Sequence, residues 1–183
     1  MAAKRKRPRS APSRSEILHL VGPFALRFFG ALFAASLLFS LGGMHKALEP
    51  AQTALAAAGA FGARLLGTDA HAEGFNIEVS RSMVMLINHE CTGVFVLLIW
   101  AALLFARRTT WKTRLWSFVL GVLIIQATNV ARLATLAAVA SHWPGLFNYF
   151  HEYVWQGLFV AMIAAMAAAW PDDAIEEQRL VSR

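Results

Sequence analysis

Four apolar stretches, the second of them short, are each bounded by charged, proline or glycine residues and dominate the pattern of hydrophobic and polar positions along the chain. They cover residues 24–41, 92–106, 116–140 and 153–170. A helix needs about 20 apolar residues to cross the hydrocarbon core of a bilayer, so stretches of this kind are typical of membrane spans. The pattern therefore predicts an all-α integral membrane protein with a bundle of four transmembrane helices.

The segment between the first two stretches, residues 42–90, has a different pattern. Residues 51–66 are rich in alanine and compatible with a helix. Further along, Phe75, Ile77 and Val79 alternate with polar residues, as in a strand with one buried face. We therefore expect a short helix and a β-hairpin, turning near Arg81, outside the bilayer between spans one and two.

Composition agrees with a membrane protein, and the distribution of charge gives its orientation. Hydrophobic residues make up 57% of the 183 residues and charged residues only 15%. The net charge of +6 could suggest nucleic acid, but six basic residues precede the first span, within residues 4–14. Four more lie in the loop between spans two and three, within residues 107–114. Because basic residues near span ends are retained in the cytoplasm, we expect both segments inside and no nucleic-acid partner.

This orientation divides the chain into five parts. We predict a basic cytoplasmic N-terminal tail over residues 1–23 and span one over 24–41. An extracytoplasmic segment follows over 42–90. A catalytic core with spans two to four covers 91–170, and a cytoplasmic C-terminal tail covers 171–183. The first span could instead be a secretory signal peptide, since small residues within 54–60 offer cleavage candidates. Its apolar run is longer than a usual signal core, and we expect it to be retained.

Three polar residues of different chemical types converge on the outer ends of the predicted spans. Cys91, the only cysteine, stands at the start of span two, and His151 at the start of span four. In span three, Gln126, Asn129 and Arg132 are spaced three apart and share one helical face. An arginine inside a span is costly and is tolerated when it faces a polar cavity or a partner. We expect these residues to form one extracytoplasmic site.

The three residue types suit complementary roles in acyl transfer. A thiolate is a nucleophile, and the helix start and a nearby guanidinium would lower the pKa of Cys91. A histidine can accept and return a proton, which suits His151 as general acid and base. The charge of Arg132 suits it to an oxyanion or a carboxylate. A structural salt bridge of Arg132 and inert packing of Cys91 remain the alternatives without chemistry.

Other histidines offer alternatives to His151. His89 and His142 could each act as the base, although both are also expected at the lipid–water boundary, where histidine needs no function. A tetrahedral metal set from His89, Cys91, His142 and His151 is conceivable, but no pair has a tight ligand spacing. We therefore predict no metal and no cofactor.

The motifs around these residues resemble the exosortase/archaeosortase family of membrane cysteine enzymes. The resemblance covers roughly Phe75 to Trp170 and rests on three ordered motifs: Glu90-Cys91-Thr92-Gly93, Gln126-Ala127-Thr128-Asn129-Val130-Ala131-Arg132, and His151-Glu152-Tyr153-Val154-Trp155-Gln156. The last motif is most similar to the short exosortase H branch. Many members of the family are longer, so this chain resembles only their core.

The resemblance implies a function. It implies a transpeptidase or protease of the bacterial inner membrane, with its active site facing the periplasm. Its substrates would be secreted proteins ending in a short motif, a hydrophobic helix and a basic tail; for the exosortase H branch the motif begins Ile-Pro-Thr-Leu. It further implies Cys91 as nucleophile, Arg132 as stabiliser of the oxyanion or substrate, and His151 as general acid and base. Asn129, Gln126, Glu90, Gln156 and Trp155 would bind substrate or support the site.

Two other function classes stay open from the sequence. One is a non-catalytic transport or assembly subunit in which Arg132 binds an anionic lipid or substrate. The other is a thiol acyltransferase on lipid-linked groups. If the chain is a transpeptidase or protease like the exosortases, the acceptor nucleophile after cleavage is water, an amine, a lipid or a sugar. The sequence does not indicate which of these it is.

Overall fold

The computed structural model describes residues 14–41, 44–80, 83–107 and 109–170. Three predicted features lie wholly or partly outside the described residues: the N-terminal tail up to residue 13, the turn near Arg81 and the C-terminal tail over residues 171–183. Residues 42–43 and 108 also lie outside them. The helices are α1 Arg14–Leu41, α2 Met44–Ala47, α3 Glu49–Leu65, α4 Val94–Ala106, α5 Trp111–His142, α6 Phe147–Tyr149 and α7 Trp155–Ala169. Three short helical turns, η1 His89–Thr92, η2 Pro144–Leu146 and η3 Phe150–Val154, and three strands, β1 His71–Glu73, β2 Asn76–Ser80 and β3 Met83–Leu86, complete the order.

Three helical stretches among the described residues are long and apolar enough to cross a membrane. They are Val21–Ser40, Trp111–His142 and Pro144–Ala169. The chain is therefore an all-α membrane protein in its main architecture. Helix α1 begins at Arg14, upstream of the predicted tail boundary at residue 23, and continues through Pro23. The helix can include Pro23 because one proline removes a single backbone hydrogen bond, which a helix can tolerate.

The predicted second span corresponds to α4, which is too short to count among these stretches. It has 13 residues, Val94–Ala106, and at 1.5 Å per residue it extends about 20 Å, less than the roughly 30 Å of a hydrocarbon core. The predicted span began at Thr92, but the backbone turns at Gly93 before the helix starts. The count of four spans therefore stays a prediction.

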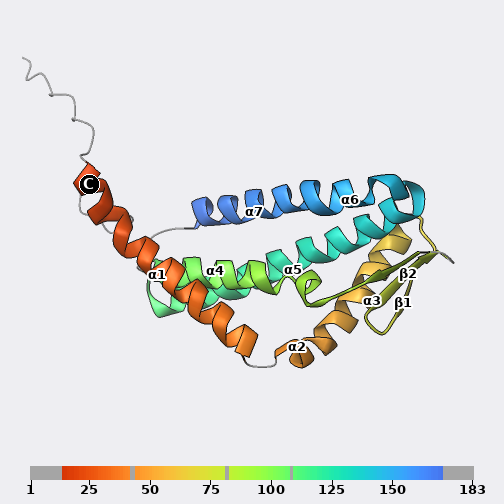
Figure 1. Cartoon of the computed structure of the whole chain (residues 1–183), viewed down its shortest axis with the longest axis horizontal. Coiled ribbons are helices and arrows are strands. Elements are labelled where there is room, and N and C mark those ends of the chain that lie inside the picture. The colour runs from red at the N-terminus through yellow and green to blue at the C-terminus, as the bar shows by residue number, and fades with distance from the viewer. Residues whose placement is uncertain (1–13, 42–43, 81–82, 108, 171–183) are drawn as a thin grey trace, which may run out of the picture.

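Helix α5 is the element shared by the two halves of the molecule. It has 32 residues and is about 48 Å long. Its first half packs beside α4 and α7, around Trp100, Leu104, Ile125 and Met166. Its second half packs beside α3 and the sheet, around Ile77, Leu133, Ala137 and Ala140. Figure 1 shows α4 along the first half of α5, and α3 and the strands along the second.

The extracytoplasmic segment predicted between spans one and two contains a helix and a three-stranded antiparallel sheet. Helix α3 covers residues 49–65, close to the predicted 51–66. The strand order is β1-β2-β3, so the sheet has one strand more than the predicted hairpin. Ile77 and Val79 of β2 are buried against α3 and α5, as their alternation with polar residues predicts.

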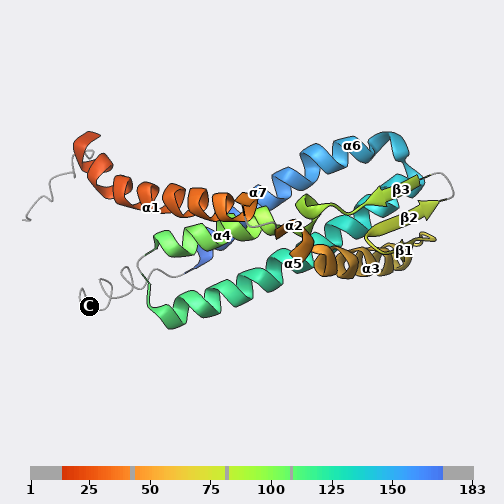
Figure 2. The ribbon, with the colours of Figure 1, turned by 60° about the horizontal axis from the view of Figure 1, so that its bottom comes forward.

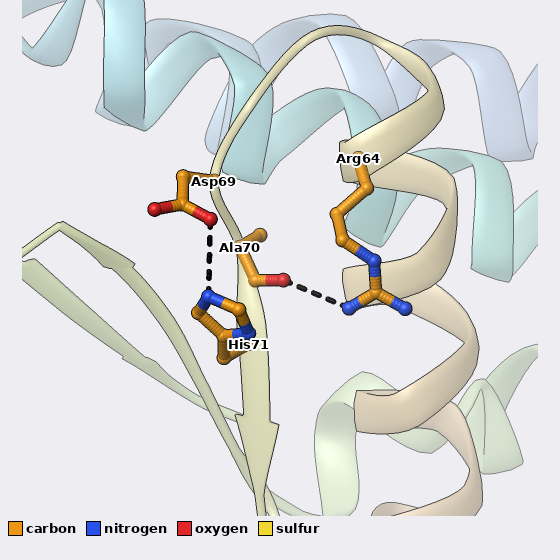
Figure 3. Close-up of polar contacts among 4 residues, drawn as sticks. All are labelled: Arg64, Asp69, Ala70 and His71. Carbon is orange, nitrogen blue, oxygen red and sulfur yellow. Dashed lines mark hydrogen bonds and ion pairs between the residues drawn. The ribbon is translucent and has the colours of Figure 1, made fainter.

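A loop between α3 and β1 joins the helix to the sheet (Figure 3). The Arg64 guanidinium in the last turn of α3 donates a hydrogen bond of 2.9 Å to the Ala70 carbonyl. The ring of His71 lies 3.0 Å from the Asp69 carboxylate. The His71–Asp69 pair is exposed, so it contributes little to stability, whereas the Arg64 bond ties the start of β1 to the end of α3.

Two glycines allow α3 and α5 to approach each other closely. A Cβ at Gly59 would lie 2.9 Å from the Leu133 Cβ and 3.0 Å from the Ile77 Cδ1, and a Cβ at Gly62 would lie 2.8 Å from the Ala134 Cβ. Real Cβ atoms do not come this near to another carbon without displacing it. Because Gly59 and Gly62 have no side chains, α3 and the second half of α5 can pack closely against each other.

We predict that Gly59→Ala destabilises the protein. The added methyl would overpack the contact with Leu133, at a cost of about 1–3 kcal/mol. Thermal unfolding in detergent measures the change, with Gly30→Ala in α1 as the matched control, because no atom lies within 4 Å of a Cβ at Gly30. A melting temperature for Gly59→Ala equal to that of Gly30→Ala would contradict the close packing.

Candidate active site

The turn that carries Cys91 is built by its own local hydrogen bonds. Asn88 follows β3 in an extended conformation, and its side-chain oxygen accepts a hydrogen bond of 3.0 Å from the Cys91 backbone N–H. The Thr92 hydroxyl donates to the His89 carbonyl at 2.6 Å. Asn88 thus acts as the N-cap of η1, the role that asparagine commonly takes at a helix start. Cys91 lies in this short turn and not, as the sequence predicts, at the start of the span.

Gly93 ends the turn and lets it approach α5. Its φ of +74° lies in the left-handed region, which favours glycine. A Cβ at this position would stand 3.4 Å from the Gln126 Oε1 and 3.5 Å from the Asn129 Nδ2. The Asn129 amide, fully buried on α5, donates a hydrogen bond of 2.7 Å to the Cys91 carbonyl. The Cys91 turn is therefore anchored to α5.

Arg132 and His151 are joined by a hydrogen bond. The Arg132 Nη2 lies 3.1 Å from the His151 Nε2. A guanidinium can only donate, so Nε2 must accept, and the imidazole is neutral with its proton on Nδ1. The Arg132 guanidinium also lies over the Phe159 ring, 5.8 Å from its centroid. The His151 ring stacks on Phe147 at 5.8 Å and an interplanar angle of 15°.

The backbone around His151 is locally widened. His151 lies within η3, a π-helical turn over Phe150–Val154 between α6 and α7. Such turns insert an extra residue into a helix and often occur at functional sites. The sequence predicts that the fourth span begins at Tyr153. The helical stretch that contains this π-turn begins earlier, at Pro144, so η2, α6 and η3 extend the predicted span upstream.

Two cavities have four lining residues in common, Asn88 and the three central residues. The larger, of about 450 Å³, lies between the Cys91 turn, α4 and α7, and the smaller, of about 240 Å³, lies between the same turn, β3, α5 and α6. Cys91, Arg132 and His151 line both. The apolar part of the larger cavity comes from Phe95, Val96, Phe159 and Val160. Cys91, Arg132 and His151 thus lie between two cavities with different linings.

Burial raises the pKa of the Cys91 thiol above its ordinary value. The positive charge of Arg132 and the Asn88 hydrogen bond lower this pKa, and Glu90 raises it, but burial has the largest effect. The sequence predicts a lowered pKa. That prediction was wrong because the thiol is partly buried, and because Gly93 separates Cys91 from the first turn of α4. At neutral pH the resting thiol is therefore protonated.

A comparison with models of known protein families identifies the family of this chain. The model of the transmembrane exosortase family matches residues 15–170. The chain belongs to the transmembrane exosortase family. No curated protein and no solved structure matches the chain. Membership in the exosortase family supports a membrane transpeptidase or protease role in general.

The supporting residues implied by the exosortase resemblance lie at different distances from the two cavities. Glu90, Trp155 and Gln156 line the larger cavity. Asn129 anchors the turn from behind, and Gln126 borders Gly93 without lining either cavity. Polar atoms on all three predicted α5 residues, Gln126 Oε1, Asn129 Oδ1 and Arg132 Nε, are buried and have no hydrogen-bond partner among the described residues.

Several residues around this candidate site were not predicted from the sequence. Asn88, Phe147 and Phe159 surround the three central residues but carry no chemistry of their own. Asn88 had a local signal, since it stands three residues before Cys91 and asparagine is a preferred N-cap. The two phenylalanines had none, because their positions against Arg132 and His151 arise from contacts between helices.

The alternative histidines lie elsewhere. The His142 ring hydrogen-bonds the Ala138 carbonyl at 3.0 Å and packs beside Trp143, and it lines neither cavity. His89 packs near Phe39 and Phe95. Among the described residues, no group of three or more His, Cys, Asp and Glu side chains could hold a metal ion.

We predict that alkylation of Cys91 rises with pH through a pKa above the ordinary value for cysteine. Only the thiolate reacts, and burial disfavours it. In Arg132→Gln the midpoint should move to still higher pH, because the charge that lowers the thiol pKa is removed. Iodoacetamide labelling across pH, followed by mass spectrometry of this single-cysteine chain, measures both midpoints. An unchanged midpoint in Arg132→Gln would show that Arg132 does not act on the thiol.

We predict that Gly93→Ala disturbs the Cys91 turn more than the fold. A non-glycine residue in the left-handed region costs about 1–2 kcal/mol, and the added methyl would touch the Asn129 and Gln126 amides. The labelling rate of Cys91 at fixed pH should change, whereas Gly22→Ala, where no atom lies within 4 Å of the added carbon, should label as the parent does. Equal rates in the two variants would refute the role of Gly93.

Proposed function

We propose that this exosortase is a cysteine transpeptidase or protease that cleaves the C-terminal sorting signals of secreted proteins. The observation that carries the proposal is the meeting of a thiol, a guanidinium and an imidazole around two adjoining cavities. We place the site at the outer face of the bacterial inner membrane, with both termini in the cytoplasm, because the basic segments flank the opposite ends of the spans. Membrane lipid surrounds the spans, and within the family we assign the chain to the exosortase H branch.

The substrate reaches the site through the bilayer that holds the enzyme. A sorting signal consists of a short motif, a hydrophobic helix and a basic tail, so its helix enters the same bilayer and its basic tail stays inside. The scissile bond then lies near the outer end of that helix. The apolar cavity between α4 and α7 suits the residues that lead into the helix, and Trp155 and Gln156 line its wall.

The resting site is closed to catalysis by its own hydrogen bond. The lone pair on the His151 Nε2 is engaged by Arg132, and the Cys91 thiol is protonated. Protonating Nε2 in this state would put two cations 3.1 Å apart. Entry of the substrate carbonyl gives Arg132 another acceptor, which frees Nε2. Substrate binding thereby completes the catalytic arrangement.

The reaction then follows the usual steps of acyl transfer. His151 Nε2 accepts the thiol proton, the Cys91 sulfur attacks the carbonyl carbon, and Arg132 stabilises the oxyanion of the tetrahedral intermediate. The C–N bond breaks, and the leaving amine takes the proton from His151. The product is a thioester on Cys91. Attack by an acceptor nucleophile, water in hydrolysis or a second group in transfer, releases the acyl product and restores the thiol.

We predict that Cys91→Ala abolishes cleavage and that His151→Gln lowers kcat by about 10²–10⁴-fold, the usual contribution of a general acid–base group. The assay uses the full chain in lipid nanodiscs and a secreted reporter ending in the motif, helix and basic tail. His142→Gln is the matched control, because His142 lines neither cavity, and it should cleave like the parent.

The same assay separates the alternatives. Processing that survives Cys91→Ala would eliminate the cysteine mechanism and leave a non-catalytic subunit. Loss of activity in His142→Gln, with His151→Gln still active, would identify His142 as the base. Transfer of a lipid-linked acyl group by the parent protein, without reporter cleavage, would instead identify a thiol acyltransferase.

A further inference from the structure

Strand β3 is an open edge of the sheet beside the candidate active site. The strand order β1-β2-β3 leaves one side of β3 without a neighbouring strand among the described residues. The chain runs from β3 through Ile87 and Asn88 directly into the Cys91 turn. In Figure 2, β3 lies on the side of the sheet nearer α6. An open edge offers backbone donors and acceptors to an added strand.

The pairing of β3 with β2 determines which backbone groups face that edge. The Ile87 N–H donates to the Phe75 carbonyl at 2.9 Å, and the register pairs Ile77 with Met85 and Asn76 with Leu86. In an antiparallel ladder, hydrogen-bonded pairs alternate with pairs that do not exchange bonds. The backbone N–H and C=O groups of Met85 and Ile87 therefore point toward β2. Those of Val84 and Leu86 point to the open side.

The smaller cavity lies along this edge. Val84, Met85 and Leu86 all line it, although their side chains alternate between the two faces of the sheet. Three consecutive strand residues can border one space when that space runs beside the backbone. The side chains of Val84 and Leu86 are 57% and 58% exposed, so they do not cover it. Cys91, Arg132 and His151 line the same cavity.

We propose that the sorting-motif residues before the scissile bond bind as an added strand on the open edge of β3. The proposal rests on the proposed function. Main-chain hydrogen bonds to Val84 and Leu86 would hold the motif extended in the smaller cavity and deliver its last residue to Cys91. Such strand addition gives affinity through the main chain, while the cavity wall at Leu133, Leu136 and Phe147 contacts alternate side chains.

The direction of the added strand follows from the two cavities. The motif precedes the hydrophobic helix of the substrate, and the apolar cavity between α4 and α7 accepts the residues that lead into that helix. The substrate chain therefore runs from the smaller cavity, past Cys91, into the larger. Because β3 also runs toward Cys91, the added strand is parallel to β3. The sheet acts as a positioning surface for the scissile carbonyl.

Leu86→Pro tests the outward backbone group with little change to the ladder. Proline removes the Leu86 N–H, which points away from β2, and proline is tolerated on edge strands whose N–H faces outward. Leu86→Ala is the matched control, because it removes the side chain and keeps the N–H. We expect kcat/KM for reporter cleavage to fall about tenfold in Leu86→Pro relative to Leu86→Ala, the effect of one lost hydrogen bond.

Iodoacetamide labelling of Cys91 checks that the site remains intact in Leu86→Pro. Unchanged labelling with a tenfold loss supports the added strand. Cleavage by Leu86→Pro equal to that by Leu86→Ala would overturn it. If labelling changes as well, disulfide cross-linking decides the question.

The cross-linking experiment uses a chain whose new thiol has no competitor. Cys91 is the sole cysteine, so Leu86→Cys in a Cys91→Ala background carries one thiol. Reporters with single cysteines at successive motif positions should cross-link at alternate positions, because strand side chains alternate between faces. Cross-linking without this alternation would overturn the added strand. If the parent protein cleaves no reporter at all, the proposed function itself fails; cleavage without alternation refutes only the strand.

Discussion

The contact between the Cys91 turn and α5 is the constraint on which the arrangement of the site depends. One hydrogen bond, from the buried Asn129 amide to the Cys91 carbonyl, fixes the turn to the helix that also carries Arg132. Gly93 permits the approach because it has no side chain and a positive φ. The buried Asn129 amide needs a hydrogen-bond partner, and the Cys91 carbonyl supplies it. Together they position sulfur and guanidinium around shared cavities.

The position of α5 explains why a charged site can exist in so apolar a chain. Its first half is surrounded by α4 and α7, and its second half by α3 and the sheet. Arg132 lies where these two cores meet, beside the polar turn and the imidazole of His151. The cost of an arginine in a hydrophobic helix is reduced because Arg132 lines two cavities and hydrogen-bonds His151, while the sheet packs against the rest of the helix. The close packing at Gly59 and Gly62 holds α3 and the sheet in place.

The proposed reaction uses the cavities on both sides of the three central residues. One side opens to the edge of β3 and the other to the apolar space between α4 and α7. A substrate with an extended motif followed by a membrane helix has the same two-part character. The resting hydrogen bond between Arg132 and His151 keeps the imidazole lone pair engaged, so an approaching carbonyl has to compete for the guanidinium. Substrate recognition and activation are thereby coupled through one residue.

Hydrophobic length, charge placement and residue type determined much of this protein from the sequence alone. They predicted a helical membrane protein and three candidate site residues, because burial periodicity and chemical type are local properties of the chain, and the resemblance of three motifs indicated the family. The turn at Gly93 and the raised pKa of Cys91 were not predictable in this way. The third strand β1 had no signal either, since its three residues are all exposed. Tertiary structure alone decided that Asn129 faces the Cys91 carbonyl, that His151 accepts from Arg132, and that β3 borders the cavity, because each depends on how separate helices and strands pack together.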